Sequence, residues 1–97
     1  MILLDFKQWL KNNKIRMECY GIKMLEIIES DSMMMLTYEN EDFITELTIR
    51  NNGFEDIEIC SKSSGEIVFF QHCMTNKDLN IDFLMGNYLN YFDKYYS

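Results

Sequence analysis

Proline is absent from this chain, glycine occurs four times, cysteine three times and histidine once. The nine bases (Lys and Arg) are outnumbered by sixteen acids (Asp and Glu). The absence of proline fits one compact unit. The cysteines Cys19, Cys60 and Cys73 are odd in number and widely spaced, which matches neither a disulfide framework nor a zinc site, so we expect free thiols. The bases are few and scattered, which argues against direct nucleic-acid binding, because phosphate contacts need clustered Lys and Arg.

Long apolar runs are also missing, so we expect neither a signal peptide nor a membrane span, and a cytoplasmic protein. His72 and its neighbour Cys73 would point to opposite faces of a strand, and the glycines form no phosphate-binding loop. Cys60 and His72 can share a face, but two ligands without a third do not make a metal site. We therefore expect no catalytic residue, cofactor or metal, although paired acids such as Glu46 and Glu58 leave a cation-binding or small-enzyme role open.

What the chain does contain supports a single domain over residues 1–97, since 47% of its residues are hydrophobic and 14% are aromatic. Residues 3–20 suit a helix, with Gly21 and Ile22 as its C-terminal cap. A second helix is expected from about Lys77 to Tyr95, with Thr75 or Asn76 as its cap and Asp78 in its first turn. The apolar stripes that predict these helices are Leu3, Phe6, Leu10 and Met17 in the first, and Ile81, Leu84, Tyr88, Phe92 and Tyr95 in the second.

Between the helices, the pattern changes to short apolar runs of the β type, separated by polar or glycine-containing turns. The runs cover 22–29, 33–39, 42–50, 54–61 and 66–73. Because their connections have hairpin length, we expect an antiparallel meander. The predicted fold is therefore α+β: an N-terminal helix, a four- or five-stranded antiparallel meander sheet and a C-terminal helix, with both helices packed on one sheet face.

Two glycine turns predict how the strands pair. If Asn51-Asn52-Gly53 and Ser63-Ser64-Gly65 are three-residue loops, paired residue numbers sum to 104 across the first hairpin and to 128 across the second. Both loops place Ile57 and Ile59 on the apolar face, beside Leu47, Ile49, Ile67 and Phe69. On the opposite face Glu46 lies across from Glu58, Thr48 from Asp56, Asp56 from His72 and Glu58 from Phe70. The second loop also sets Ser61 opposite Ile67 and Lys62 opposite Glu66.

The acids concentrate on that second face. Residues 26–66 hold eleven acids and two bases, a net charge of −9, and such a field attracts basic partners. Like charges directly opposite each other lower stability, so their presence favours a binding role over simple solvation. We also expect Met34, Leu36, Tyr38, Ile44, Val68 and Phe70 on this face, giving an acidic cluster framed by apolar side chains. The alternative is that a helix covers those apolar residues and the acids lie at its rim.

Three segments carry a resemblance to a known family: FKQWLKN at 6–12, ENEDFITELTI at 39–49 and SGEIVFFQH at 64–72. Together with the order of helix, acid-rich hairpins and tyrosine-rich terminal helix, they resemble the small acidic immunity proteins of contact-dependent growth inhibition systems, in particular the TriTu type. The resemblance implies a non-catalytic antitoxin that binds a tRNA-cleaving toxin nuclease domain, in a complex that can also contain elongation factor Tu. A homodimer stays open.

The partner-binding residues follow from combining the acidic face with that resemblance. Glu46, Asp56 and Glu58 are expected to pair with Lys and Arg of the toxin, with Glu39, Glu41, Asp42 and Glu55 as outer contributors. Apolar anchors would be Phe70, Tyr38 and Met34, and His72 would contact the partner. The competing interpretation is a homo-oligomeric adaptor that uses the same face for self-association.

Overall fold

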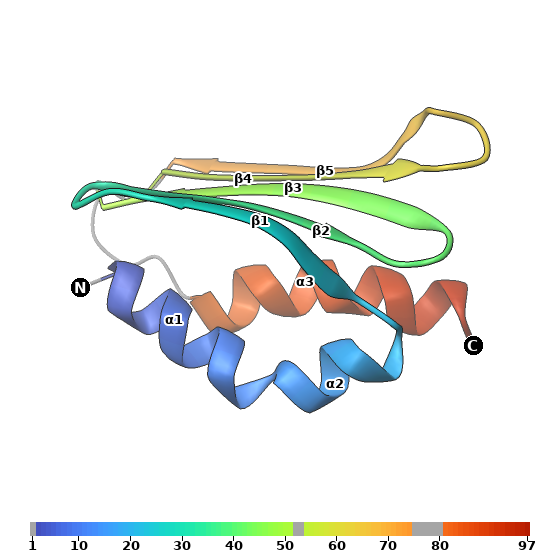
Figure 1. Cartoon of the computed structure of the whole chain (residues 1–97), viewed down its shortest axis with the longest axis horizontal. Helices are drawn as coiled ribbons and strands as arrows, with labels where there is room; N and C mark the ends of the chain where they lie inside the picture. The colour runs from blue at the N-terminus through green and yellow to red at the C-terminus, as the bar shows by residue number, and fades with distance from the viewer. Residues whose placement is uncertain (1, 52–53, 75–80) are drawn as a thin grey trace.

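The protein forms two layers, with the helices on one side of a five-stranded sheet (Figure 1). A computed structural model describes residues 2–51, 54–74 and 81–97. The elements are α1 (Ile2–Asn12), α2 (Lys14–Cys19), β1 (Lys23–Glu29), β2 (Met33–Glu39), β3 (Phe43–Arg50), β4 (Phe54–Ser61), β5 (Ile67–Met74) and α3 (Ile81–Tyr95). All neighbouring strands are antiparallel in the order β1-β2-β3-β4-β5, so the predicted α+β meander is confirmed. Thr75, Asn76, Lys77 and Asp78, where the start of the last helix was expected, lie outside the described residues.

The N-terminal helix is divided at Asn13 rather than continuous over 3–20. Asn13 has φ −111° and ψ 11°, and its side-chain amide donates a 2.9 Å hydrogen bond to the Trp9 carbonyl, beside the backbone bond of 3.0 Å to the same oxygen. Asparagine side chains compete for backbone partners in this way, which weakens helix continuation. The predicted cap is confirmed: Gly21 has φ 72°, and the Ile22 amide donates to the Met17 carbonyl at 3.1 Å.

The register deduced from the glycine turns is largely confirmed. Glu46 pairs with Glu58, Asp56 with His72 and Glu58 with Phe70, and Gly65 has the positive φ of 73° that the second turn requires. Gly53 lies outside the described residues. Next to the turn of the last hairpin the prediction was wrong, because a bulge after Ile59 sets Cys60 opposite Ile67. Lys62 accordingly forms its ion pair with Glu39, at 2.7 Å, instead of Glu66.

The core lies between the helices and the inner sheet face. Leu47, Ile49, Ile57 and Ile59 are buried there, against Phe6 and Trp9 of α1 and Tyr88 and Phe92 of α3. Aromatic edges contribute to this packing: the Phe43 and Phe92 rings lie 5.7 Å apart at 90°. Both terminal helices therefore cover the predicted face and leave the other one uncovered. Ile67 does not belong to this core, since the bulge leaves it 57% exposed.

The assignment of β2 to the acidic face was wrong. Met34, Leu36 and Tyr38 pair with Ile49, Leu47 and Thr45, so all three lie on the inner face and are buried. The cause is the turn between β2 and β3: its pairs sum to an odd number, which places even-numbered residues of β2 beside odd-numbered residues of β3. A change of parity in one loop exchanges the two faces of a strand.

Asn40 holds this turn in place and is itself buried. Its side-chain oxygen accepts hydrogen bonds from the backbone amides of Asp42, at 3.0 Å, and Phe43, at 2.9 Å. Its side-chain amide donates to the Tyr20 carbonyl at 2.9 Å and to the Tyr96 hydroxyl at 3.0 Å. One side chain thus links the β2–β3 turn to the end of α2 and to the residues after α3.

Candidate functional site

The uncovered sheet face carries two parallel rows of side chains that cross all five strands. Strand pairing fixes their order, because directly opposite residues on adjacent strands share a face. The first row contains Glu26, Thr37, Glu46, Glu58 and Phe70, and the second contains Ile28, Met35, Thr48, Asp56 and His72. We call these ten residues the outer face. Five of the residues predicted to bind a partner therefore lie together on it: Glu46, Asp56, Glu58, Phe70 and His72.

Glu46 and Glu58 are the centre of its negative charge. They lie directly opposite each other on β3 and β4, and within the described part of the chain neither forms an ion pair. Such a like-charged cross-strand pair lowers stability by about 0.2–1 kcal/mol. Their uncompensated carboxylates are therefore free to attract cations or basic side chains.

Cys60 lies next to this pair, and its thiol donates a weak hydrogen bond of 3.6 Å to Glu58. Burial raises the pKa of the Cys60 thiol, and the hydrogen bond to Glu58 and the charge of its carboxylate raise that pKa further. The protonated thiol is a poor nucleophile. This arrangement gives no support to cysteine-based chemistry at the site.

Asp56 is compensated, in contrast to the glutamates. His72 contacts one of its carboxylate oxygens through Nδ1, and a guanidinium nitrogen of Arg50 lies 3.7 Å from the other. Both partners project from neighbouring strands on the same face. The second row is therefore more nearly neutral, and most of the negative field comes from the first.

The acids of the β2–β3 turn lie at one end of the sheet. Glu39 forms its ion pair with Lys62, and Asp42 accepts a hydrogen bond of 2.6 Å from the Tyr96 hydroxyl. Burial raises the pKa of Tyr96 to about 12, and the Asp42 hydrogen bond raises it as well. Glu41 is exposed and remains accessible to a partner. This end of the sheet can thus extend the outer face, with Glu41 as its most accessible acid.

Three residues predicted to bind a partner do not reach the surface. Met34 and Tyr38 are only 1% and 6% exposed, since they belong to the inner face of β2. Glu55 is 0% exposed, because it has the same parity as Ile57 on β4 and points inward. Gln71 donates hydrogen bonds of 3.2 and 3.4 Å to its two carboxylate oxygens. These three positions are corrected from partner contacts to core positions.

Ile28 and Met35 take the place that Met34 and Tyr38 were expected to fill. Both are about half exposed and neighbour each other in the second row, while Phe70 ends the first row with 61% of its surface exposed. Sequence reasoning missed Ile28 and Met35. The odd pairing sum of the β2–β3 turn is the signal that identifies them, because it places Met35 beside Thr48 rather than in the core.

The fold defines this chain as an α+β protein whose candidate site is an acidic and apolar sheet surface. Comparison with protein families, with curated proteins and with solved structures finds no match. Within residues 2–51, 54–74 and 81–97, no group of three or more His, Cys, Asp or Glu side chains is placed to hold a metal ion. The helices of these same ranges include none that is long and apolar enough to cross a membrane.

Proposed function

We propose that this protein is a cytoplasmic immunity protein that binds a cognate bacterial toxin domain and neutralises it without catalysis. The toxin would be a tRNA-cleaving nuclease, and the complex can also contain elongation factor Tu. The observation that carries the proposal is the Glu46–Glu58 couple, which has no ion pair among the described residues, on a sheet face that none of the described helices covers, bordered by the exposed Phe70. The resemblance of the three sequence segments to the TriTu type of immunity protein supports the choice of partner.

Electrostatics explains why such a face suits such a partner. A nuclease presents basic residues to its RNA, so an acidic inhibitor is attracted to that surface and can block it. Steering by complementary charge raises the association rate by about 10- to 1000-fold and weakens as salt is added. Fast capture matters for an antitoxin, because any toxin that stays free continues to cleave its substrate. Protection requires a dissociation constant of about 1 nM or lower, equivalent to about −12 kcal/mol.

Charge alone does not supply that affinity, so the apolar residues are equally important. Exposed hydrophobic surface is offered by Phe70 at the end of the acidic row and by Met35 and Ile28 in the row beside it. Aromatic side chains that become buried in an interface commonly carry a large part of the binding energy. We therefore assign anchoring to Phe70 and rate and specificity to Glu46 and Glu58.

The direct test is co-purification of this chain with the product of the gene immediately upstream, followed by binding kinetics. Glu46→Lys and Glu58→Lys should each slow association and reduce its salt dependence, and Phe70→Ala should speed dissociation. Glu66→Lys is the matched control, because it makes the same charge change at an exposed position beside the β4–β5 turn. A dissociation constant that is the same for all three charge reversals and the parent would rule out the outer face as the binding site.

The second candidate is self-association through the same face, as in an adaptor module. Exposed Ile28, Met35 and Phe70 favour it, since apolar side chains exposed on one face often mark an interface between copies. Against it, two outer faces in contact would place both glutamate rows near each other. Mass measurements over a range of concentrations separate the two candidates: a dimer that Phe70→Ala dissociates supports self-association.

A further inference from the structure

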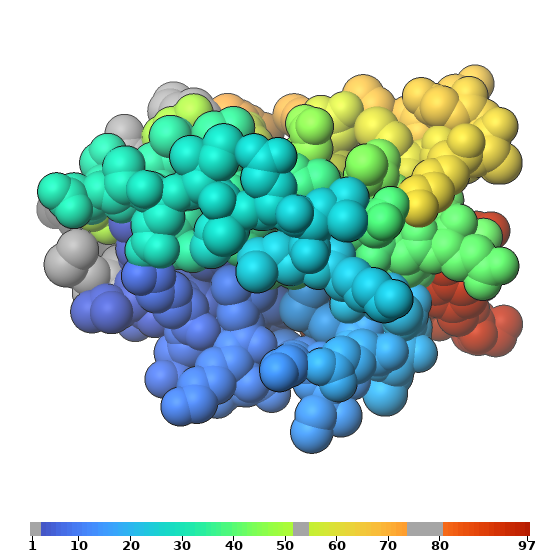
Figure 2. Space-filling view, in the orientation of Figure 1, coloured from blue at the N-terminus to red at the C-terminus, as the bar shows by residue number. Residues whose placement is uncertain are grey.

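A groove lies on the other side of β2, between the edge of the sheet and the first two helices. Figure 2 shows β1, in cyan, along the near edge of the molecule above α1 and α2, in blue. The cavity has a volume of about 850 Å³, and its walls are mainly apolar: Leu10, Met17, Ile22, Met34 and Leu36. That volume falls within the range of roughly 300–1,000 Å³ that is typical of small-ligand sites.

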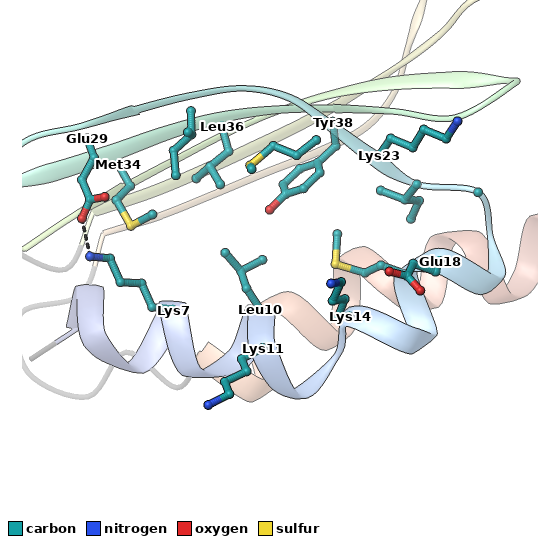
Figure 3. Close-up of a pocket in the computed structure, with 15 residues that line it drawn as sticks. Lys7, Leu10, Lys11, Lys14, Glu18, Lys23, Glu29, Met34, Leu36 and Tyr38 are labelled. Atoms are coloured by element: carbon teal, nitrogen blue, oxygen red, sulfur yellow. Dashed lines mark ion pairs between the residues drawn. The ribbon is translucent and has the colours of Figure 1, made fainter.

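The rim of this groove is basic, although the chain as a whole has a charge of −7. Four lysines (Lys7, Lys11, Lys14 and Lys23) and two glutamates (Glu18 and Glu29) line it. Lys7 forms an ion pair with Glu29 at one end, as the dashed line in Figure 3 marks. Among the described residues the other three lysines form no ion pair. Figure 3 shows the ammonium groups of Lys11 and Lys23 pointing away from the groove, so Lys14 provides the unpaired positive charge nearest its apolar walls.

Tyr38 provides a second and independent indication of a ligand. Its side chain is 94% buried, and Figure 3 shows its hydroxyl pointing down from β2 into the space above the helices. Within the described part of the chain this hydroxyl has no hydrogen-bond partner. Buried polar groups without a partner are uncommon because they lower stability, so this hydroxyl is available as a donor to a ligand in the groove.

We propose that the groove binds a single-chain amphiphile with an anionic head group. The head accepts a hydrogen bond from the Tyr38 hydroxyl and pairs with the ammonium group of Lys14, which lies on the helix side of the groove opposite Tyr38 (Figure 3). The apolar chain runs along Leu10 and Leu36 towards Met34 and the closed Lys7–Glu29 end. Fatty acids and alkyl phosphates both have this chemistry.

Other occupants fit less well. A second copy of the chain would bring the same lysine rim against its own equivalent, which repels at short range. An acidic amphipathic helix of a partner protein satisfies the charges, but it offers no single acceptor that must reach the buried Tyr38 hydroxyl. The groove lies on the opposite side of the sheet from the outer face, so this proposal can be tested independently of the proposed antitoxin function.

The test is a titration of isotope-labelled protein with dodecanoate below its micelle concentration, followed by amide NMR shifts. We expect saturable one-to-one binding with shifts confined to groove residues. Each methylene added to the carboxylate chain should tighten binding by about fourfold, which corresponds to about 0.8 kcal/mol per buried methylene. Dodecyltrimethylammonium, with the same chain and the opposite charge, should bind much more weakly. Comparison with dodecyl phosphate, which has the same chain, shows whether the site prefers a phosphate or a carboxylate head group: the more tightly bound of the two identifies the head group.

Variants assign the contacts. Lys14→Glu should weaken dodecanoate binding by about tenfold or more, as expected when a charged hydrogen bond is lost, and Tyr38→Phe by a few-fold. Lys94→Glu on α3 is the matched control and should leave dodecanoate binding unchanged. Because Lys14 and Lys94 are both exposed, neither variant should impair folding, and circular dichroism verifies this. Absence of saturable binding, equal binding of the cationic detergent, or equal losses in Lys14→Glu and Lys94→Glu would each overturn the proposal. So would binding of an acidic amphipathic peptide in the groove in place of dodecanoate.

Discussion

Glu55 should make the stability of this protein depend on pH near neutrality. It is a fully buried carboxyl group, and burial raises its pKa from 4.5 to about 7, while the Gln71 hydrogen bond partly opposes the rise. A pKa that is raised on folding means that the folded state binds the proton more tightly than the unfolded state. The stabilisation is therefore complete below about pH 4.5 and is lost as pH rises through about 7.

The magnitude follows from the size of the shift. A difference of about 2.5 units at about 1.4 kcal/mol per unit gives roughly 3.5 kcal/mol of unfolding free energy between the two ends of that pH range. Glu55→Gln removes the titrating group and keeps an oxygen that can accept the hydrogen bond from Gln71. We expect this variant to be more stable than the parent by about 3 kcal/mol at pH 8, which raises the melting temperature by about 12–24 °C. At pH 5 the two proteins should differ little.

The assay is urea unfolding of the parent and of Glu55→Gln at half-unit pH intervals from 5 to 8. Glu66→Gln, which neutralises an exposed acid, is the control and should leave the pH profile of the parent unchanged. The reasoning is refuted if the stability difference between parent and Glu55→Gln is the same at pH 5 and pH 8. It is also refuted if the variant is the less stable protein at pH 8.

Three further predictions concern the free chain. Glu46→Gln should raise the unfolding free energy by about 0.5 kcal/mol, because the substitution removes the repulsion with Glu58. Urea unfolding measures this free energy, and an unchanged or lower value would contradict the cross-strand pairing of Glu46 with Glu58. Asn40→Asp should lower the melting temperature by an amount equivalent to about 2–4 kcal/mol, since the two hydrogen bonds donated by the Asn40 amide are lost and a carboxylate is buried beside Asp42. The exposed Asn90→Asp serves as control, and equal effects of the two substitutions would argue against the role of Asn40. Gly65→Ala should lower the unfolding free energy by about 1 kcal/mol in thermal unfolding, because Gly65 has a φ of 73°, although no neighbour obstructs the added methyl group. An unchanged free energy would mean that the turn relaxes.

The sequence was sufficient to predict the sheet order and most of the register, because local turns determine both. Each glycine turn constrains only two adjacent strands, and those constraints agreed at Ile57 and Ile59. The turn after β2 contains no glycine, so nothing local fixed its parity, and Met34 and Tyr38 were assigned to the wrong face. An error of this kind assigns every residue of the strand to the wrong face of the sheet.

Features that depend on the distance between layers could not be predicted in the same way. The interruption at Asn13 separates two helical segments whose periodicity reads as one, and the groove exists because α1 and α2 do not fill the space below β1. Glu55 has the parity of a core residue, but its charge suggested the surface. Its burial requires Gln71 from the next strand, a contact that is invisible in a list of residue types.

Strand β1 has a consequence for the dynamics of the protein. It is the edge of the sheet, all seven of its residues are exposed, and its main contacts are with β2. Segments with few buried contacts open at the lowest free energy, so the amides of β1 should exchange with solvent before those of β3 and β4. Such opening would detach one wall of the groove while the outer rows from β2 to β5 stay intact. Amide exchange can therefore distinguish a ligand that stabilises β1 from a partner held by the central strands.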